Sequence, residues 1–197
     1  RGHRGIIAPP AFGKSSNVRK DFGAFCLEGG YKEAVKVLGI DASLRGTGLA
    51  VIEQAGSRAA ARHWEVLKIA AQAPHSECLR TIRERLDAVL AAHRPDAAAI
   101  EGGFFFKNPK VALVLGEVRG VAIACCAAAG VPVFEYSPRR AKQNVTGWGA
   151  APKEQVAKMV RSVLGLDETP PPDATDALAL ALCHAQTNRG LVKGEPI

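Results

Sequence analysis

Acidic side chains that could do chemistry together stand at the ends of two apolar segments. Val35–Asp41 and Asp96–Glu101 are short runs of strand character, and each ends on a carboxylate. Ligands gather at the carboxyl ends of strands in open α/β sheets, so neighbouring parallel strands would place Asp41 and Glu101 side by side. Taken singly, either acid could instead cap its strand at the surface.

A second acidic pair begins the last helical segment, PDATDALALAL. Asp173 and Asp176 are three residues apart and therefore share one helical face. In a first helical turn, the helix dipole and the free N–H groups favour anions. Asp is also a common N-cap, which is the alternative role here. Asp176 fits that role less well, because it lies next to Ala177 and Leu178 in an otherwise apolar helix.

If this helix packs its N-terminus against the strand ends, the four carboxylates converge. Such a cluster is repulsive unless cations are present. Hard divalent ions take oxygen ligands, and Mg²⁺ is the usual ion when phosphate is the substrate. Two such ions would clamp the attacking and leaving oxygens of a phosphoryl displacement. The acids therefore favour metal-dependent phosphodiester hydrolysis.

Basic side chains flank the acidic positions. The chain carries 26 Lys and Arg against 19 Asp and Glu, a net charge of +7 that favours nucleic acid but is a weak signal alone. Lys142 and Lys153 lie on either side of Gly147-Trp148-Gly149, where the backbone could approach a ligand closely. We expect both lysines to contact phosphate. For Lys158 and Arg161, on a helix flank, we expect a solvated surface.

Three consecutive aromatic residues, Phe104 to Phe106, follow the second strand-end acid in a loop that glycines precede. Three adjacent rings cannot all face one way, so a core role for the whole run is excluded. An exposed ring could stack on bases or wedge between them. We therefore assign Phe104 as a DNA contact.

The elements that must position these residues form an α/β pattern. A meander of three strands precedes βαβ units, which together predict a mixed sheet with helices on its faces. The predicted strands are Val35–Asp41, Thr47–Ile52, Ala60–Ile69, Asp96–Glu101 and Val131–Tyr136, and the predicted helices are Ser76–Ala92, Pro109–Ala129, Pro138–Val145, Pro152–Leu164 and Asp173–Gln186.

The 197 residues suggest one domain with tails. We expect a basic N-terminal tail over residues 1–34, a nuclease domain over 35–188 and a C-terminal tail over 189–197. Five cysteines without CxxC or Cys/His ligand spacing predict neither a disulfide framework nor a zinc site, and fit a reducing cytosol.

The segment Pro109–Ala129 is apolar nearly all round. Such a helix needs burial on most sides, so we expect it to face both the core and a second subunit. Glu117 and Arg119 interrupt this apolar region, and we therefore expect no membrane span.

Taken together, these residues resemble the RuvC family of Holliday junction resolvases over about Val35 to Gln186. Strand-end acids are common to all RNase H-like nucleases, whereas FEYSPRRAKQNVTGWG and PDATDALALAL are more specific to RuvC. Two departures stand out: Ala42-Ser43 follow the first acid where Pro-Gly is common, and Gly102-Gly103 follow the second where Gln is frequent. Further matching pieces are Gly39-Ile40, Arg45, Thr47-Gly48, Lys107-Asn108, Gly116, Arg119-Gly120-Val121-Ala122, Lys142-Gln143 and Met159-Val160.

The resemblance implies an RNase H-like fold, with a mixed five-stranded sheet flanked by helices. It also implies a cytoplasmic bacterial homodimer that nicks a four-way DNA junction symmetrically, leaves 5′-phosphate and 3′-hydroxyl ends, and works with the RuvA and RuvB branch-migration proteins. It places two Mg²⁺ ions per subunit, with Mn²⁺ as a plausible substitute, on Asp41, Glu101, Asp173 and Asp176. The implied DNA contacts are Phe104, Lys107, Arg139, Arg140, Lys142 and Lys153.

Three alternatives stay open. An actin-like sugar kinase or ATPase begins with a similar strand, acid and Gly-rich turn, but it needs a second domain for which this chain is too short. A different nuclease of the same fold, such as a processing RNase or a transposase core, shares the acids. A non-catalytic junction-binding protein could keep the fold, although the presence of all four acids argues against it.

Overall fold

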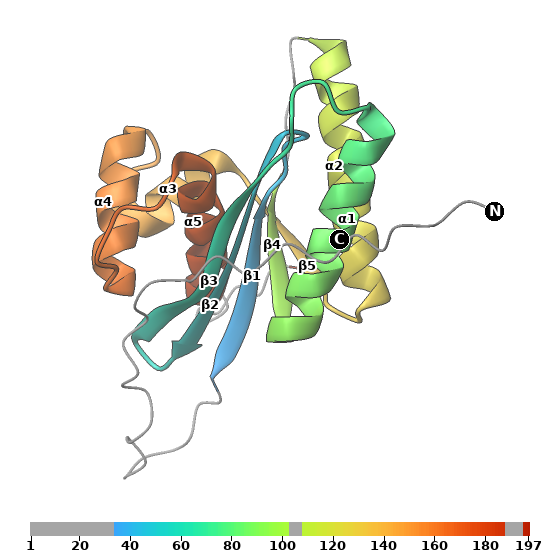
Figure 1. Cartoon of the computed structure of the whole chain (residues 1–197). Helices are drawn as coiled ribbons and strands as arrows, with labels where there is room; N and C mark the ends of the chain where they lie inside the picture. The colour runs from blue at the N-terminus through green and yellow to red at the C-terminus, as the bar shows by residue number, and fades with distance from the viewer. Residues whose placement is uncertain (1–33, 103–107, 188–194) are drawn as a thin grey trace, which may run out of the picture.

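The computed structural model describes residues 34–102, 108–187 and 195–197, and a five-stranded sheet runs through its centre (Figure 1). The predicted tail over residues 1–34 and part of the C-terminal one therefore lie outside the described residues, and the domain limits stay a prediction. The elements in chain order are β1 (Val35–Asp41), β2 (Gly46–Ala55), β3 (Arg58–Lys68), α1 (His75–His93), β4 (Ala97–Glu101), α2 (Pro109–Ala128), β5 (Val133–Tyr136), α3 (Pro138–Thr146), α4 (Lys153–Leu164) and α5 (Pro172–Thr187).

The sheet is mixed, as the sequence predicted. Its strand order is β3-β2-β1-β4-β5. β1, β2 and β3 form an antiparallel meander, whereas β4 runs parallel to both β1 and β5. Ile40 pairs with Ile100 in the parallel register, so the acids that follow them, Asp41 and Glu101, end adjacent strands at the same edge of the sheet.

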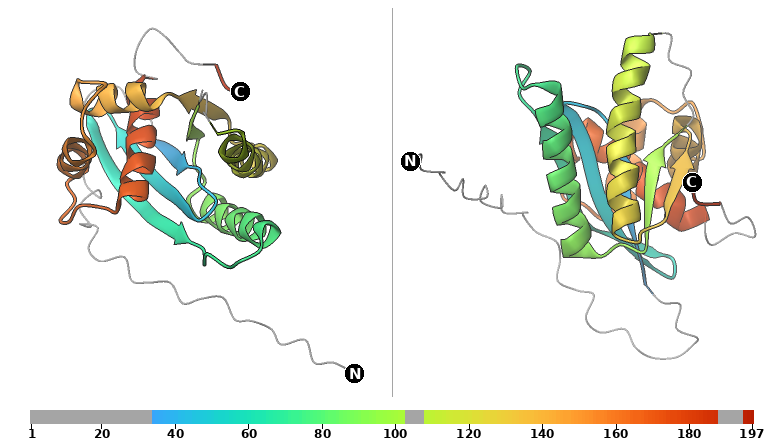
Figure 2. Two further views of the ribbon diagram at one scale, coloured as in Figure 1. Left: turned by 90° about the horizontal axis from the view of Figure 1, so that it is seen from above. Right: turned by 90° about the vertical axis from the view of Figure 1, so that its right-hand side faces the viewer.

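Helices cover both faces of the sheet. α1 and α2 lie side by side on one face, and α3, α4 and α5 lie on the other (Figure 2). Successive side chains of a strand point to opposite faces. Val37 accordingly joins the core beneath α5, while its neighbour Leu38 joins the core beneath α1 and α2.

The hairpin between β2 and β3 extends further than the predicted strands. β2 continues past Ile52 through Glu53 and Gln54 to Ala55, and β3 already begins at Arg58. The predicted strand ended at Ile52 because polar residues follow it. Polar side chains are tolerated in an outer hairpin, so the strand itself continues. Here the Nε of Arg62 lies 2.5 Å from Oε2 of Glu53 across the two strands.

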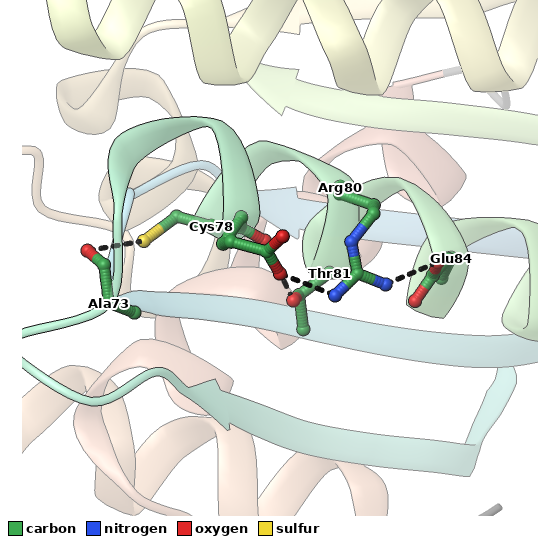
Figure 3. Close-up of polar contacts among 6 residues, drawn as sticks. Ala73, Cys78, Arg80, Thr81 and Glu84 are labelled. Carbon is green, nitrogen blue, oxygen red and sulfur yellow. Dashed lines mark hydrogen bonds and ion pairs between the residues drawn. The ribbon is translucent and has the colours of Figure 1, made fainter. Parts of the chain in front are cut away.

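The first turn of α1 is tied to the turn before β2. Arg45 donates hydrogen bonds to the carbonyl oxygens of Ala70 and Ala73, and the Cys78 thiol also contacts the Ala73 carbonyl (Figure 3). Further along the exposed face of α1, Arg80 bridges two glutamates, one of which is Glu84 (Figure 3). α1 is therefore anchored at the end that lies next to the Asp41 turn.

α2 leaves much of its apolar surface open in the single chain. Only Val118, Ala122, Cys125 and Cys126 of this helix are buried. Val111 and Leu113, in contrast, are 44% and 67% exposed. α2 therefore faces the core on one side, as expected, and the expected contact of its open side with a second subunit stays a prediction.

α2 is also long and apolar enough to cross a membrane, by length and composition alone, with 22% of its most apolar window buried. Length and composition alone are weak evidence for a span, so the expectation of no membrane span, based on Glu117 and Arg119, stays a prediction. Both charges have partners in the folded domain: Glu117 pairs with His75 of α1, and Arg119 pairs with Glu135 of β5.

α5 makes a backbone-to-backbone contact with β1 and β2. A Cβ atom added to Gly48 would lie 2.0 Å from the carbonyl oxygen of Asp173, and one added to Gly39 would lie 1.9 Å from that of Ala177. Real Cβ atoms do not approach so closely, so only glycine fits at both positions. The helix that carries two of the acids therefore sits directly on the strand that carries a third.

Gly48→Ala tests this contact. The new methyl group has to push the start of α5 away from the sheet, and overpacking of this kind costs about 1–3 kcal/mol. We expect the urea midpoint of the variant to fall. Gly120→Ala is the matched control, because nothing lies within 4 Å of a Cβ at that position. An unchanged midpoint for Gly48→Ala would contradict the close contact.

Candidate active site

The four acids singled out from the sequence lie on three elements that meet at one edge of the sheet. Asp41 ends β1, Glu101 ends β4, and Asp173 and Asp176 lie in the first turns of α5. The side chains of all four are partly exposed rather than buried. Lys153, the first residue of α4, reaches the same place, with its Nζ 3.4 Å from Oδ2 of Asp176.

Electrostatics link the four acids. The pKa of Asp41 is raised from 3.8 to about 7, first by desolvation and then by the negative charges of Asp176, Glu101 and Asp173, whereas Lys153 acts in the opposite direction. Ionisation of such a carboxyl group costs free energy, because the group is desolvated and lies near other negative charges. Asp41 therefore lies at the centre of the acidic group.

Glu101 is perturbed in the same direction. Desolvation and the charge of Asp176 raise its pKa, while Lys153, Arg119 and Lys142 lower it. Three basic residues therefore act electrostatically on an acid at the end of β4. This mixture of acids and bases suits a site in which an anion and cations bind together.

The donor chemistry of this site fits hard divalent cations, although the side chains do not form a closed cage. Among the described residues, no group of three or more His, Cys, Asp and Glu side chains is arranged so that it could hold a metal ion as it stands. All four side chains are carboxylates, whose oxygen atoms are the ligands that hard divalent cations prefer. We keep the assignment of the four acids as ligands as a proposal.

Arg119 fixes the position of the end of β4, a role that was not predicted from the sequence. From α2, its guanidinium donates to the carbonyl oxygen of Glu101 and to the carboxylate of Glu135. Gly102 completes this contact: a Cβ there would lie 2.6 Å from the Cβ of Glu135. A charged residue within an apolar helix was the available signal. The Gly that departs from the family pattern is thus required by packing.

The turn after Asp41 also departs from the family pattern, and Ser43 stabilises it. The Ser43 hydroxyl accepts a hydrogen bond from the Gly46 N–H at 3.1 Å. The hydroxyl of Thr47 donates to the Ser43 carbonyl. Two hydrogen bonds of this kind fix a tight turn between β1 and β2, so a Pro-Gly pair is not needed to form it.

The predicted DNA contacts divide into two groups. Arg139, Arg140 and Lys142 lie on α3, whose N-cap Ser137 accepts a hydrogen bond from the Arg140 N–H. α3 lies on the same face of the sheet as α4, which begins at Lys153 (Figure 1). Phe104 and Lys107 lie outside the described residues. The assignment of all six stays a prediction.

Other basic residues take structural roles. Arg161 donates to the carbonyl oxygens of Leu166 and Asp167 and so closes the C-terminal end of α4. Lys158 is exposed on the same helix. Both agree with the expected solvated flank. His184 of α5 is fully buried, and burial lowers its pKa to about 4. Its Nδ1 lies 2.8 Å from the hydroxyl of Tyr136.

Asp41→Asn tests the strain on Asp41 through stability. Because the folded-state pKa is raised, the stabilising effect of the bound proton is present below about pH 4 and is lost as the pH rises towards 7. In EDTA, we expect the Tm of Asp41→Asn to exceed that of the wild type more at pH 8 than at pH 5. Glu154→Gln, which changes an exposed acid on α4, is the control. An equal difference at both pH values would contradict the perturbation.

Comparisons with known proteins agree with this geometry. A family model described as Crossover junction endodeoxyribonuclease RuvC matches residues 37–184. The proteins of that name from Alkalilimnicola ehrlichii and Myxococcus xanthus are 47% and 44% identical; the alignments cover 76% and 80% of this chain, and 90% and 84% of theirs.

Solved structures extend the comparison. The structure described as T. thermophilus RuvC in complex with Holliday junction substrate matches with a TM-score of 0.78 and 39% identity, over 83% of this chain and 99% of that chain. The yeast mitochondrial Holliday junction resolvase Ydc2 matches with a TM-score of 0.56 and 15% identity, over 76% and 77%, and shows likeness of fold alone. The RNase H-like architecture that the resemblance implied is confirmed, and the chain belongs to the RuvC family of crossover junction endodeoxyribonucleases, which are metal-dependent.

Proposed function

We propose that this protein resolves four-way DNA junctions by metal-dependent hydrolysis of phosphodiester bonds. The observation that carries the proposal is the meeting of the four acids at one edge of the sheet, where Asp41 and Glu101 end adjacent parallel strands and Asp173 and Asp176 lie in the first turns of α5. The relative from T. thermophilus was solved with a Holliday junction substrate, which supports the same substrate class here. The alternative of an actin-like kinase or ATPase has no support, because the family model that matches residues 37–184 describes a nuclease.

Asp41, Glu101, Asp173 and Asp176 would hold two Mg²⁺ ions, with Mn²⁺ as a plausible substitute. Bound there, the ions supply an activated water and stabilise the departing 3′ oxygen. The acids supply the negative charge that holds the ions, and ionisation of Asp41 is part of that binding, because its proton must leave first. The products would be a 5′-phosphate and a 3′-hydroxyl end.

Lys153 would exchange partners when substrate arrives. In the free protein its ammonium group lies 3.4 Å from Asp176 and offsets part of the negative charge. Cations between the acids would take over that task, and Lys153 would then be available to a DNA phosphate. Lys142, Arg139 and Arg140 on α3 would neutralise neighbouring phosphates. Phe104 remains the predicted contact at the junction centre, and Lys107 remains a predicted DNA contact beside the site.

We further propose that the enzyme is a homodimer formed through α2. The exposed apolar residues Val111 and Leu113 leave this helix without sufficient cover in one chain. A four-way junction cut at two symmetric points suits a two-fold dimer with one site per subunit. Cover by a second subunit also accounts for the apolar helix without a membrane. Action in the bacterial cytoplasm and cooperation with RuvA and RuvB follow as expectations from family membership.

Junction cleavage tests the proposed reaction. We expect a labelled, mobile four-way DNA junction to be nicked symmetrically in Mg²⁺, and the nicks to be ligatable because they carry 5′-phosphates. EDTA should abolish cleavage, since the acids cannot bind phosphate unaided. Asp41→Asn and Glu101→Gln should lower the cleavage rate at least a hundredfold while leaving junction binding intact.

Glu154→Gln is the control, because it removes one exposed acid from α4 and changes none of the four proposed metal ligands. Junction cleavage that continues in EDTA, or at wild-type rate in Asp41→Asn, would refute the metal site. Cutting of duplex DNA or of an RNA hybrid in preference to the junction would instead place the chain with other RNase H-like activities.

Leu113→Glu tests the dimer. A charge on the most exposed large apolar residue of α2 should turn the dimer into a monomer, because the partner could not desolvate it. Sedimentation velocity gives the mass of each species. Val163→Glu, which places the same charge on an exposed residue of α4, should leave the mass unchanged. A monomeric wild type, or a dimeric Leu113→Glu variant, would overturn the assignment of this interface.

A further inference from the structure

Trp148 is a large aromatic side chain left open to solvent between α3 and α4. Its exposed fraction is 56%, which is unusual because indole rings bury a large apolar surface and contribute much to stability when covered. The second tryptophan, Trp64 of β3, is half-buried and packs against the core. No role was predicted for Trp148 from the sequence, where it stands between Gly147 and Gly149. Neither the metal site nor the α2 interface explains its exposure.

The backbone that carries Trp148 is fixed rather than loose. The Thr146 hydroxyl accepts a hydrogen bond from the Trp148 N–H at 3.1 Å, and it lies 2.9 Å from the Trp148 carbonyl oxygen. The N–H of Ala151 donates to that same carbonyl at 3.2 Å. Each of these bonds restrains the position from which the ring projects, so little conformational entropy would be lost on binding.

The glycines on either side hold the segment in place. Gly147 ends α3 in the left-handed conformation at φ 77°. A Cβ on Gly149 would lie 2.6 Å from Cγ of Arg139, so the segment packs directly against a predicted phosphate contact. The ring is therefore presented at a defined distance from the basic face of α3.

The residues before and after Trp148 in the chain suit the binding of a DNA strand better than the binding of a protein. α3 carries Arg139, Arg140 and Lys142 and no acid, and α4 begins at Lys153 five residues after the tryptophan. Lys153, the first residue of the helix that follows, contacts Asp176 in the acidic group. An exposed ring with phosphate-binding side chains on both sides is the arrangement that binds single strands, in which bases stack on aromatic residues.

We infer that Trp148 is a stacking site for an unpaired base, or for a base at an opened step, of the junction strand whose phosphates Lys142 and Lys153 hold. The inference rests on the proposed function and names one of the contacts by which the junction is held. Stacking is tolerant of sequence, because every base has a π face. Trp148 therefore adds affinity for opened DNA without adding base specificity.

Fluorescence tests the contact directly in the full-length protein, with EDTA to prevent cleavage. A four-way junction should quench the tryptophan emission of the wild type and of Trp64→Phe, but not of Trp148→Ala. Trp148→Ala should bind the junction about tenfold more weakly, and Trp148→Phe should keep most of the affinity, because a phenyl ring still stacks. A continuous duplex should quench less than the junction.

Salt dependence separates stacking from charge. Lys153→Gln should reduce the slope of log affinity against log salt by about one, since it removes one phosphate contact, whereas Trp148→Ala should keep the wild-type slope. Wild-type binding and quenching in Trp148→Ala would overturn this inference alone. A wild type that neither binds nor cleaves junctions would overturn the proposed function, and this inference with it.

Discussion

The contact between the backbone of α5 and the backbones of β1 and β2 governs the geometry of the active site. A helix normally packs on a sheet through a layer of side chains, which would hold the acids of α5 far from those of the strands. At Gly39 and Gly48 this layer is missing, and carbonyl oxygens of α5 lie where a Cβ would be. The small side chains along α5, such as Ala177 and Ala181, allow the same approach. Negative charges are thereby forced together from elements far apart in the sequence.

Forcing carboxylates together has a cost, and the structure shows how the protein limits it. The pKa of Asp41 is raised to about 7, and the ammonium group of Lys153 lies close to the carboxylate of Asp176. Neither device neutralises the group fully, which leaves the site ready for cations and for a phosphate. Residues that oppose folding but favour a reaction are expected at catalytic sites, because stability and function select for different arrangements. The strain therefore lies at the proposed active site, while the cores on both faces of the sheet are apolar.

Local patterns predicted much of this arrangement. Short apolar runs located the strands that end at Asp41 and Glu101, and the three-residue spacing of Asp173 and Asp176 placed them on one helix face. Contacts between distant segments carry no such local signal. The bond from Arg119 to the carbonyl oxygen of Glu101 joins α2 to β4, and only the folded chain reveals it. An apolar composition likewise predicts that the surface of α2 will be covered, but it does not say by which chain.

The helices on the two faces of the sheet carry different features. α3 and α4 carry basic residues assigned as DNA contacts and α5 carries two of the acids, whereas α2 on the other face carries the apolar residues proposed for the dimer. Arg119 extends from α2 to the carboxylate of Glu135 and to the carbonyl oxygen of Glu101, and so ties α2 to the ends of β4 and β5. Because a guanidinium group presents its donors in a rigid, planar arrangement, it holds two acceptors at once, which a lysine would do less precisely. The position of Glu101 at the proposed site therefore depends, through a single side chain, on how α2 packs. A dimer formed through α2, as proposed, would cover the same helix that fixes this acid.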